Sequence, residues 1–159
     1  MVVVTAHLDF KPITVAEFRA NGGEDLMRAN YAEMEPRPDV RTLDVQWDLL
    51  SMLEEKGHTL NYGVWRDDKL VGYLSAVYLA GASLHYADWH VVEVCVIYVD
   101  PRFRNLRVVT ELMRLLQEDC RKLGVDSIFW KAREGSSFQR YLDRKEAFLL
   151  LEHTYEELI

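Results

Sequence analysis

The chain has 159 residues, of which 49% are hydrophobic, and a formal net charge of −7. This length fits one globular core, so we expect a single domain over residues 1–159. The acidic balance argues against tight binding to duplex nucleic acid, and the longest apolar runs are too short or too polar to cross a bilayer. Because MVVVTAHLDF lacks the basic region and cleavage pattern of a signal peptide, we expect a cytoplasmic protein.

The two cysteines, Cys95 and Cys120, do not form a CxxC motif. Cysteines in this pattern predict neither a disulfide framework nor a metal site. We therefore expect both thiols to lie in the core, where unpaired cysteine usually packs as a small apolar side chain.

The N-terminal part of the chain predicts helices. Thr14 and Glu17 form a capping box at the start of an amphipathic helix, and the Gly-Gly pair at 22–23 weakens or breaks that helix. A second helix is predicted from about 42 to 56, where apolar residues recur at helical spacing, and Gly57 ends it.

Strands follow the helices. Residues 60–66 and 70–80 are rich in Val, Tyr, Trp and Leu and flank the turn Asp67-Asp68-Lys69, which predicts a hairpin. Residues 81–87 predict a longer turn. Residues 90–99 are apolar at nearly every position, as in a central strand that is covered on both faces.

The remaining elements alternate between helix and strand. They are a helix over 105–123 with Gly124 as its stop signal, a strand over 127–131, a short helix over 136–145 and a last strand over 148–158. This order predicts a mixed sheet with helices on its faces, a fold of α/β or α+β type.

Arg102, Arg104 and Arg107 lie where the strand over 90–99 leads into the helix over 105–123. Open α/β sheets bind ligands at the carboxyl ends of their strands, and a helix N-terminus attracts phosphate. Arginine adds bidentate anion donors. The position of these arginines indicates a phosphate site, although ordinary solvated turn residues would give the same composition.

A longer stretch around this junction resembles a known family. The segment VCVIYVDPRFRNLRVVTELMRLLQEDCRKLGVDSIFWKA is similar to motif A of the GNAT N-acetyltransferase superfamily, and WRDDKLVGYLSAV is similar to the hairpin before that motif. The resemblance covers about residues 60–132. It implies a mostly antiparallel central sheet of about six or seven strands flanked by about four helices. The tail resembles a subset frequent in bacteriophage genomes, which would place the protein in the host cytoplasm.

The family's pyrophosphate loop has Gln or Arg, two residues, Gly, one residue, and then Gly or Ala. Arg104 occupies the first position, but Arg107 and Val109 stand in place of the two small residues, and Asn105 is a residue that tolerates positive φ. The resemblance implies acetyl-CoA as the acyl donor, with a strand that pairs with its pantetheine arm and amides that hold its diphosphate. The implied cofactor residues are Ile97, Tyr98, Val99, Arg102, Arg104, Asn105, Leu106, Arg107, Val108, Val109 and Thr110.

Acetyl transfer to an amine requires a base for the amine and a proton for the leaving thiolate. Glu93 is the candidate base, because it is the only charged residue between Asp88 and Asp100 and matches a strand position where some family members carry a catalytic glutamate. Burial would raise its pKa. A structural ion pair is the alternative for Glu93, and Asp88, His90 and His85 are weaker substitutes.

The resemblance implies a tyrosine as the acid on the helix after the strand SIFWK, and Tyr141 lies there. Strict counting back from Phe148 reaches Asp143 instead, and a tyrosine at an apolar helical position also serves packing. Tyr141 is the predicted acid, with its register open.

The acceptor is expected to be a primary amine. An acidic rim that would favour a cation is formed by Glu33, Glu35, Asp39, Asp44, Asp48 and Asp88, although acids also cover ordinary solvated faces. Two other classes stay open: a degenerate GNAT-fold binding, inhibitory or virion-associated module, which the missing glycines favour, and an enzyme that modifies nucleic-acid bases. The last strand could pair at a sheet edge in a homodimer.

Overall fold

The computed structural model describes residues 7–35, 37–39, 41–80, 88–148 and 150. They fall into two compact units, one ending at Phe129 and the other beginning at Trp130. A single domain over 1–159 stays a prediction. None of the helices in this described part of the chain is both long and apolar enough to span a membrane.

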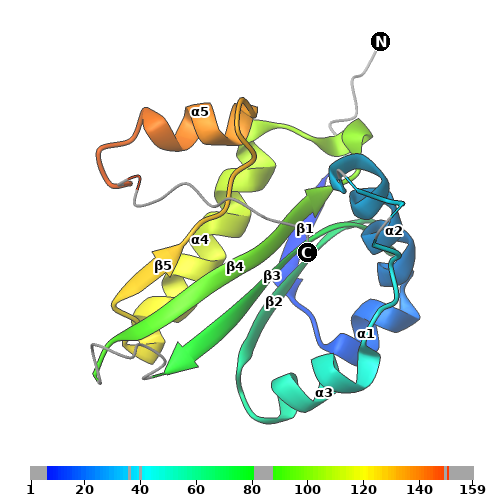
Figure 1. Cartoon of the computed structure of the whole chain (residues 1–159), viewed down its shortest axis with the longest axis horizontal. Coiled ribbons are helices and arrows are strands. Elements are labelled where there is room, and N and C mark those ends of the chain that lie inside the picture. Colours follow the sequence, from blue (N-terminus) through cyan, green and yellow to red (C-terminus); the bar gives the residue numbers. More distant parts are fainter. Residues whose placement is uncertain (1–6, 36, 40, 81–87, 149, 151–159) are drawn as a thin grey trace. The chain divides into compact units, whose positions relative to one another are not determined.

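The first unit contains a five-stranded sheet whose spatial order follows the chain (Figure 1). Its strands are β1 (Leu8–Pro12), β2 (Thr59–Arg66), β3 (Lys69–Ala80), β4 (His90–Val99) and β5 (Ser127–Phe129). Neighbours from β1 to β4 are antiparallel, and β5 is parallel to β4. The predicted mixed sheet is confirmed, with five strands in the described residues instead of six or seven.

Strand β1 was not predicted. Its sequence, LDFKP, is short and ends in proline, which cannot donate to a ladder and is confined to sheet edges. β1 is such an edge, because it pairs only with β2 within the described sheet. The predicted turn over 81–87 lies outside the described residues, as does most of the predicted strand over 148–158; Phe148 and Leu150 belong to no strand.

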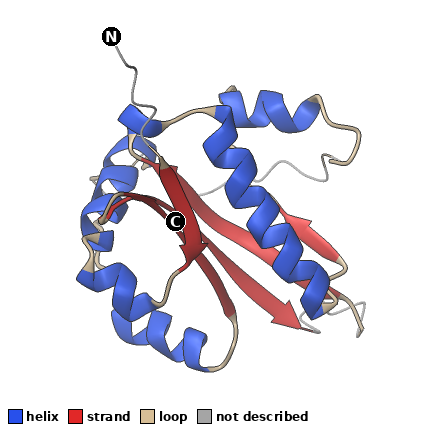
Figure 2. Ribbon diagram, turned by 180° about the vertical axis from the view of Figure 1, so that it is seen from behind, coloured by secondary structure: helices blue, strands red, loops and turns tan. Residues whose placement is uncertain are grey.

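Five α-helices and one 3-10 turn complete the described structure (Figure 2). They are α1 (Val15–Ala20), α2 (Gly23–Met34), α3 (Trp47–Glu55), the turn η1 (Pro101–Phe103), α4 (Leu106–Leu123) and α5 (Ser137–Asp143). About four helices were expected. The extra one arises because Gly22, with φ of 84°, separates α1 from α2.

The helix boundaries follow their caps. The capping box at Thr14 is confirmed, and Gly124 ends α4 in the left-handed conformation at φ 69°. α3 begins at Trp47 rather than near residue 42. Its N-cap, Gln46, makes no side-chain capping bond, so no start signal marked the true boundary.

The two faces of the sheet are covered by different helices. α4 contributes the buried side chains Val108, Leu112, Met113, Leu116 and Cys120, and it lies behind the sheet in Figure 1 and in front of it in Figure 2. On the other face, Phe18 of α1 packs with Trp65, Tyr73 and Tyr98, together with partly buried residues of α2 and α3. The strand over 90–99 lies inside the sheet, as predicted; α4 covers one face, and on the other Tyr98 and the partly buried Val96 join the core around Phe18.

Candidate active site

The carboxyl end of β4 leads through η1 into the N-terminus of α4. Asn105 is the N-cap, and its Oδ1 accepts a hydrogen bond from Val108 N at 3.1 Å. Its φ of −158° is ordinary extended backbone, so the tolerance of Asn for positive φ is not used here. Leu106 and Arg107 supply the other amides at the very start of the helix, which are anion-binding groups in general.

Arg107 and Val109, which replace the expected glycines, both lie in the first turns of α4. Asp67 is the one non-glycine residue with positive φ in the described chain, so neither position needs the conformational freedom of glycine. Val109 is half-buried and Val108 is buried. The missing glycines therefore cause no backbone strain in this helix.

Two of the three arginines at the junction are held by carboxylates of the protein. Arg102 Nη2 lies 2.6 Å from Asp100 Oδ2, and this hydrogen bond is the main reason that the pKa of Asp100 falls to about 2. Arg104 donates from both terminal nitrogens to Glu33, at 2.7 and 2.6 Å. Arg107 is exposed at the start of α4, beside Leu106, which is 57% exposed.

Strand β4 has neighbours of unequal length. β3 pairs with it from His90 to Val99, whereas β5 pairs only with Val91–Glu93. The β3 pairing shifts register between Ser75 and Ala76, which places a β-bulge at Cys95. Beyond the bulge, no strand of the described chain pairs with residues 96–99 on the side away from β3.

Three predicted cofactor residues, Ile97, Tyr98 and Val99, lie on this stretch. The side chains of Tyr98 and Val99 are buried, and Ile97 is half-buried. An unpaired strand edge offers backbone donors and acceptors to an extended ligand. Thr110, the last predicted cofactor residue, lies inside α4 and donates its hydroxyl to Arg107 O at 3.1 Å.

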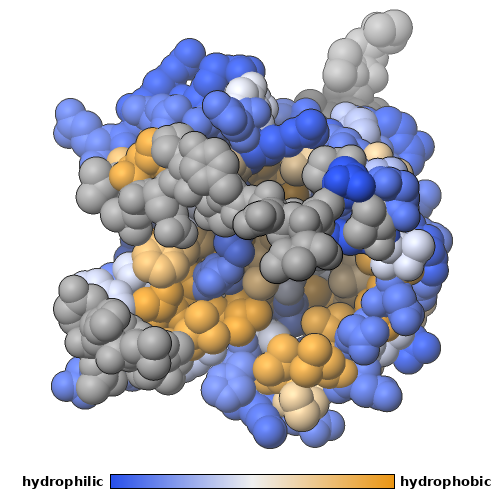
Figure 3. All heavy atoms as spheres, viewed as in Figure 1, coloured by the Kyte–Doolittle hydropathy of each residue, from blue (hydrophilic) through white to orange (hydrophobic). Residues whose placement is uncertain are grey.

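The predicted base, Glu93, is half-buried on β4. It lies opposite Val77 of β3, so the two side chains share a face of the sheet, and next to Phe129 of β5. Figure 3 shows the face of the molecule opposite α4, where part of the visible surface is apolar. Glu93 is six residues before Val99, which corresponds to roughly 20 Å along an extended strand.

The expectation of two core thiols is half right. Cys120 is buried, as predicted, but Cys95 is exposed, because the bulge takes it out of the alternation that buries its neighbours. Periodicity alone could not show a bulge.

Tyr141 lies on α5 in the second unit. Its ring stacks on Phe138 with centroids 6.5 Å apart, and the Lys145 ammonium lies 5.5 Å from its centroid. Ser136 caps the helix by accepting from Gln139 N. These contacts show a packing role within the unit, and the acid role of Tyr141 stays a prediction.

The substitutes for Glu93 differ in their surroundings. His90 Nδ1 lies 2.7 Å from Tyr78 Oη, and the backbone N–H of His90 donates to Asp126. Asp88 is exposed, and His85 lies outside the described residues.

The predicted acidic rim is partly neutralised by arginines. Glu33 pairs with Arg104, Glu35 lies 3.7 Å from Arg41, and Asp39 lies 3.1 Å from Arg37. The sequence could not reveal the partner of Glu33, since Arg104 is 71 positions away. The cap by Asn105, in contrast, follows the common pattern of Asn before an apolar helix and could have been found.

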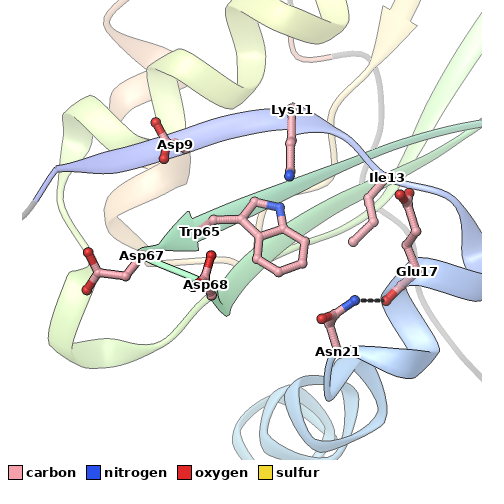
Figure 4. Close-up of a pocket in the computed structure, with 8 residues that line it drawn as sticks. All are labelled: Asp9, Lys11, Ile13, Glu17, Asn21, Trp65, Asp67 and Asp68. Carbon is pink, nitrogen blue, oxygen red and sulfur yellow. Dashed lines mark hydrogen bonds between the residues drawn. The ribbon is translucent and has the colours of Figure 1, made fainter.

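Two cavities lie near the β2–β3 turn. One, of about 400 Å³, is lined by Asp9, Lys11, Ile13, Glu17, Asn21, Trp65, Asp67 and Asp68. There the Lys11 ammonium covers the Trp65 ring, 4.7 Å from its centroid (Figure 4). This cavity shares no residue with the predicted site. The other, of about 600 Å³, reaches η1 through Arg102 and Phe103.

Comparisons with solved structures agree with this architecture. An aminoglycoside acetyltransferase from an uncultured soil metagenomic sample superposes with a TM-score of 0.72 at 14% identity, covering 98% of this chain and 99% of that one. The aminoglycoside N-acetyltransferase AAC(6')-Iy in complex with CoA gives 0.72 at 15% identity, covering 100% and 99%. A ribosomal-protein-alanine N-acetyltransferase from Brucella melitensis gives 0.68 at 16% identity, covering 96% and 99%.

At these identities the likeness shows the fold. A comparison with curated protein sequences gave no match. The profile of the acetyltransferase (GNAT) family, however, matches residues 22–139, which include β2 to β5 and all of α4. The chain therefore belongs to the GNAT acetyltransferase family.

Proposed function

We propose that the protein is an acetyl-CoA-dependent N-acetyltransferase that acts on a primary amine. The observation that carries the proposal is the end of β4, where a strand edge without a described neighbour leads into the capped N-terminus of α4. The pantetheine arm adds to residues 97–99 as a short strand, and the diphosphate accepts hydrogen bonds from the Leu106 and Arg107 amides.

Transfer takes place by direct attack in a ternary complex. Glu93 removes a proton from the acceptor ammonium, directly or through water, and the neutral nitrogen attacks the acetyl carbonyl carbon. A C–N bond forms and the C–S bond breaks. As the C–S bond breaks, Tyr141 gives a proton to the leaving thiolate, and the nitrogen loses its second proton, through water, to the tyrosinate. The products are the N-acetylated amine, CoA and one proton, which Glu93 releases to solvent.

The neighbours suggest the acceptors to test first. One similar structure is an aminoglycoside acetyltransferase in complex with sisomicin, and another is a ribosomal-protein-alanine N-acetyltransferase. Each suggested acceptor presents a cationic amine, which suits a chain with a net charge of −7. A panel of sisomicin, an alanine-terminated peptide and a polyamine therefore samples three amine classes.

The first experiment is calorimetric titration with acetyl-CoA, with free CoA and ADP as controls, followed by thiol release with the amine panel. Micromolar binding and amine-dependent release of CoA are expected. Absence of binding at millimolar acetyl-CoA contradicts the proposal.

A second function is favoured by one observation. Arg102 and Arg104 are already paired with Asp100 and Glu33, which leaves fewer unneutralised cations beside the diphosphate. Arginines neutralised in this way would fit a GNAT-fold binding module with a vestigial cofactor site. Tight binding of acetyl-CoA with no thiol release from any amine would support the module.

A further inference from the structure

Arg104, which follows η1, contacts two elements of the first unit, α2 and β4. Its terminal nitrogens donate to both carboxylate oxygens of Glu33 on α2, and its Nε donates to the carbonyl of Val99 at 2.6 Å. Its guanidinium carbon also lies 5.1 Å from the centroid of the Tyr98 ring. The side chain is thus fixed from several directions at the end of β4.

These contacts do not use all of its donors. A guanidinium has five N–H groups in a rigid fork; the hydrogen bonds to Glu33 and Val99 take three of them, and the Tyr98 side chain engages another. One N–H group is left for a ligand without breaking the pair with Glu33. Arg104 can therefore keep Glu33 and still donate to an anion.

The ion pair between Arg104 and Glu33 also links parts of the chain that are far apart in sequence. The two residues are 71 positions apart, and α2 itself packs against β3 and β4. The side chains are 39% and 41% exposed, a setting in which a simple ion pair contributes little. A bidentate pair that also engages Val99 is different, because its main effect is on geometry.

We infer that Glu33 is a positioning residue for the segment from Arg104 to Val108: it holds the Arg104 side chain beside the Val99 carbonyl, so that the remaining N–H group is a preset donor for the diphosphate of CoA. The inference rests on the proposed function. Preorganisation removes the entropy that a long side chain loses when a ligand orders it. Glu33 acts through Arg104 and need not touch the cofactor.

The opposite effect would follow if Glu33 only competed for Arg104. Removing its charge would then free a cation and strengthen the binding of an anion. Glu33→Gln and Glu33→Asp separate the two cases, because the aspartate keeps the charge but is one methylene shorter. Glu24→Gln is the matched control, since Glu24 pairs with Arg28 at 2.6 Å on the same helix.

The test is titration of wild type and these three variants with CoA, with thermal unfolding measured in parallel. We expect Glu33→Gln and Glu33→Asp to bind CoA about 3- to 10-fold more weakly and Glu24→Gln to bind as the wild type does. Unchanged or tighter binding by Glu33→Gln overturns the inference. A loss confined to thermal stability, equal in Glu24→Gln, overturns it as well.

Hydrogen exchange of the ligand-free protein separates this inference from the proposed function. Glu33→Gln should speed amide exchange over residues 104–108, while Glu24→Gln should not. If the wild type binds no CoA, the proposed function fails, and faster exchange still upholds the tie between Glu33 and the loop. Unchanged exchange in that stretch contradicts the tie.

Discussion

Asn105 Oδ1 accepts a hydrogen bond from Val108 N at 3.1 Å and so caps the helix to which we assign the diphosphate. Asn105→Ala removes the cap and should cost about 1 kcal/mol of unfolding free energy. Asn105→Asp keeps an acceptor and suits the helix dipole, but it places a negative charge where the diphosphate should bind. We expect it to fold as stably as the wild type and to bind CoA more weakly.

Denaturant unfolding and CoA titration of the two variants check this pair of expectations. If Asn105→Asp binds CoA as tightly as the wild type does, the diphosphate does not lie at this helix N-terminus.

Restoring the family's two loop glycines should lower the stability of the protein. Arg107 and Val109 have helical backbone conformations in α4, where glycine is less favourable than alanine by about 1 kcal/mol per residue. Arginine is nearly as good a helix former as alanine and valine is a weaker one, so the double change Arg107→Gly and Val109→Gly should lower stability by about 1 kcal/mol and bring no gain in CoA affinity.

Arg107→Ala is the control, because it removes the side chain and keeps the helix. Tighter CoA binding by the double glycine variant would show that the loop of the wild type is degraded.

Asp100 should make the protein sensitive to acid. Its pKa in the folded state is about 2, chiefly through the Arg102 hydrogen bond, and lies below the value of about 3.9 for an unfolded aspartate. A depressed folded-state pKa contributes stability that is present above the unfolded pKa and is lost as the pH falls through the folded one. Between about pH 4 and pH 2, the unfolding free energy of Asp100→Asn should fall less steeply than that of the wild type.

Arg102→Ala should also weaken the pH dependence of the unfolding free energy over this range. The double variant should behave much like either single one, because both changes remove the same interaction. Parallel curves for wild type and Asp100→Asn would contradict the assignment.

The sequence predicted the elements that are marked by local chemistry. The predicted strand over 90–99 is β4. The capping box at Thr14 begins α1, and Gly124 ends α4, both as predicted. Each depends on periodicity or on a backbone preference that a few neighbouring residues specify.

Features that depend on distant partners could not be predicted in this way. The bulge at Cys95 arises from a shift in the register between β4 and β3, and the ion pair between Glu33 and Arg104 joins residues 71 positions apart. Strand β1 is held by its register with β2, such as Phe10 opposite Val64. No local pattern encodes these pairings, and they decide the shape of the candidate site.

The two cysteines should differ in reactivity. Cys120 is 3% exposed, and burial raises the pKa of its thiol to about 11, so little thiolate forms at neutral pH. Cys95 is exposed. A thiol reagent should label one group quickly in the folded protein and a second only after unfolding. Cys95→Ser should abolish the fast phase, and fast labelling of two thiols would contradict the burial of Cys120.

Glu93 tests the chemistry itself. If it is the base, Glu93→Gln should lower kcat by roughly 10²- to 10⁴-fold and leave CoA affinity little changed, because the base acts on the amine and not on the diphosphate. Cys95→Ser, two positions along β4, is the control for disturbance of the strand and should keep kcat. If Glu93 is only a structural ion-pair partner, Glu93→Gln should instead lower the unfolding free energy at full turnover. Steady-state kinetics with an accepted amine, together with denaturant unfolding of both variants, distinguishes the two roles, and full turnover in Glu93→Gln would show that the base assignment is wrong.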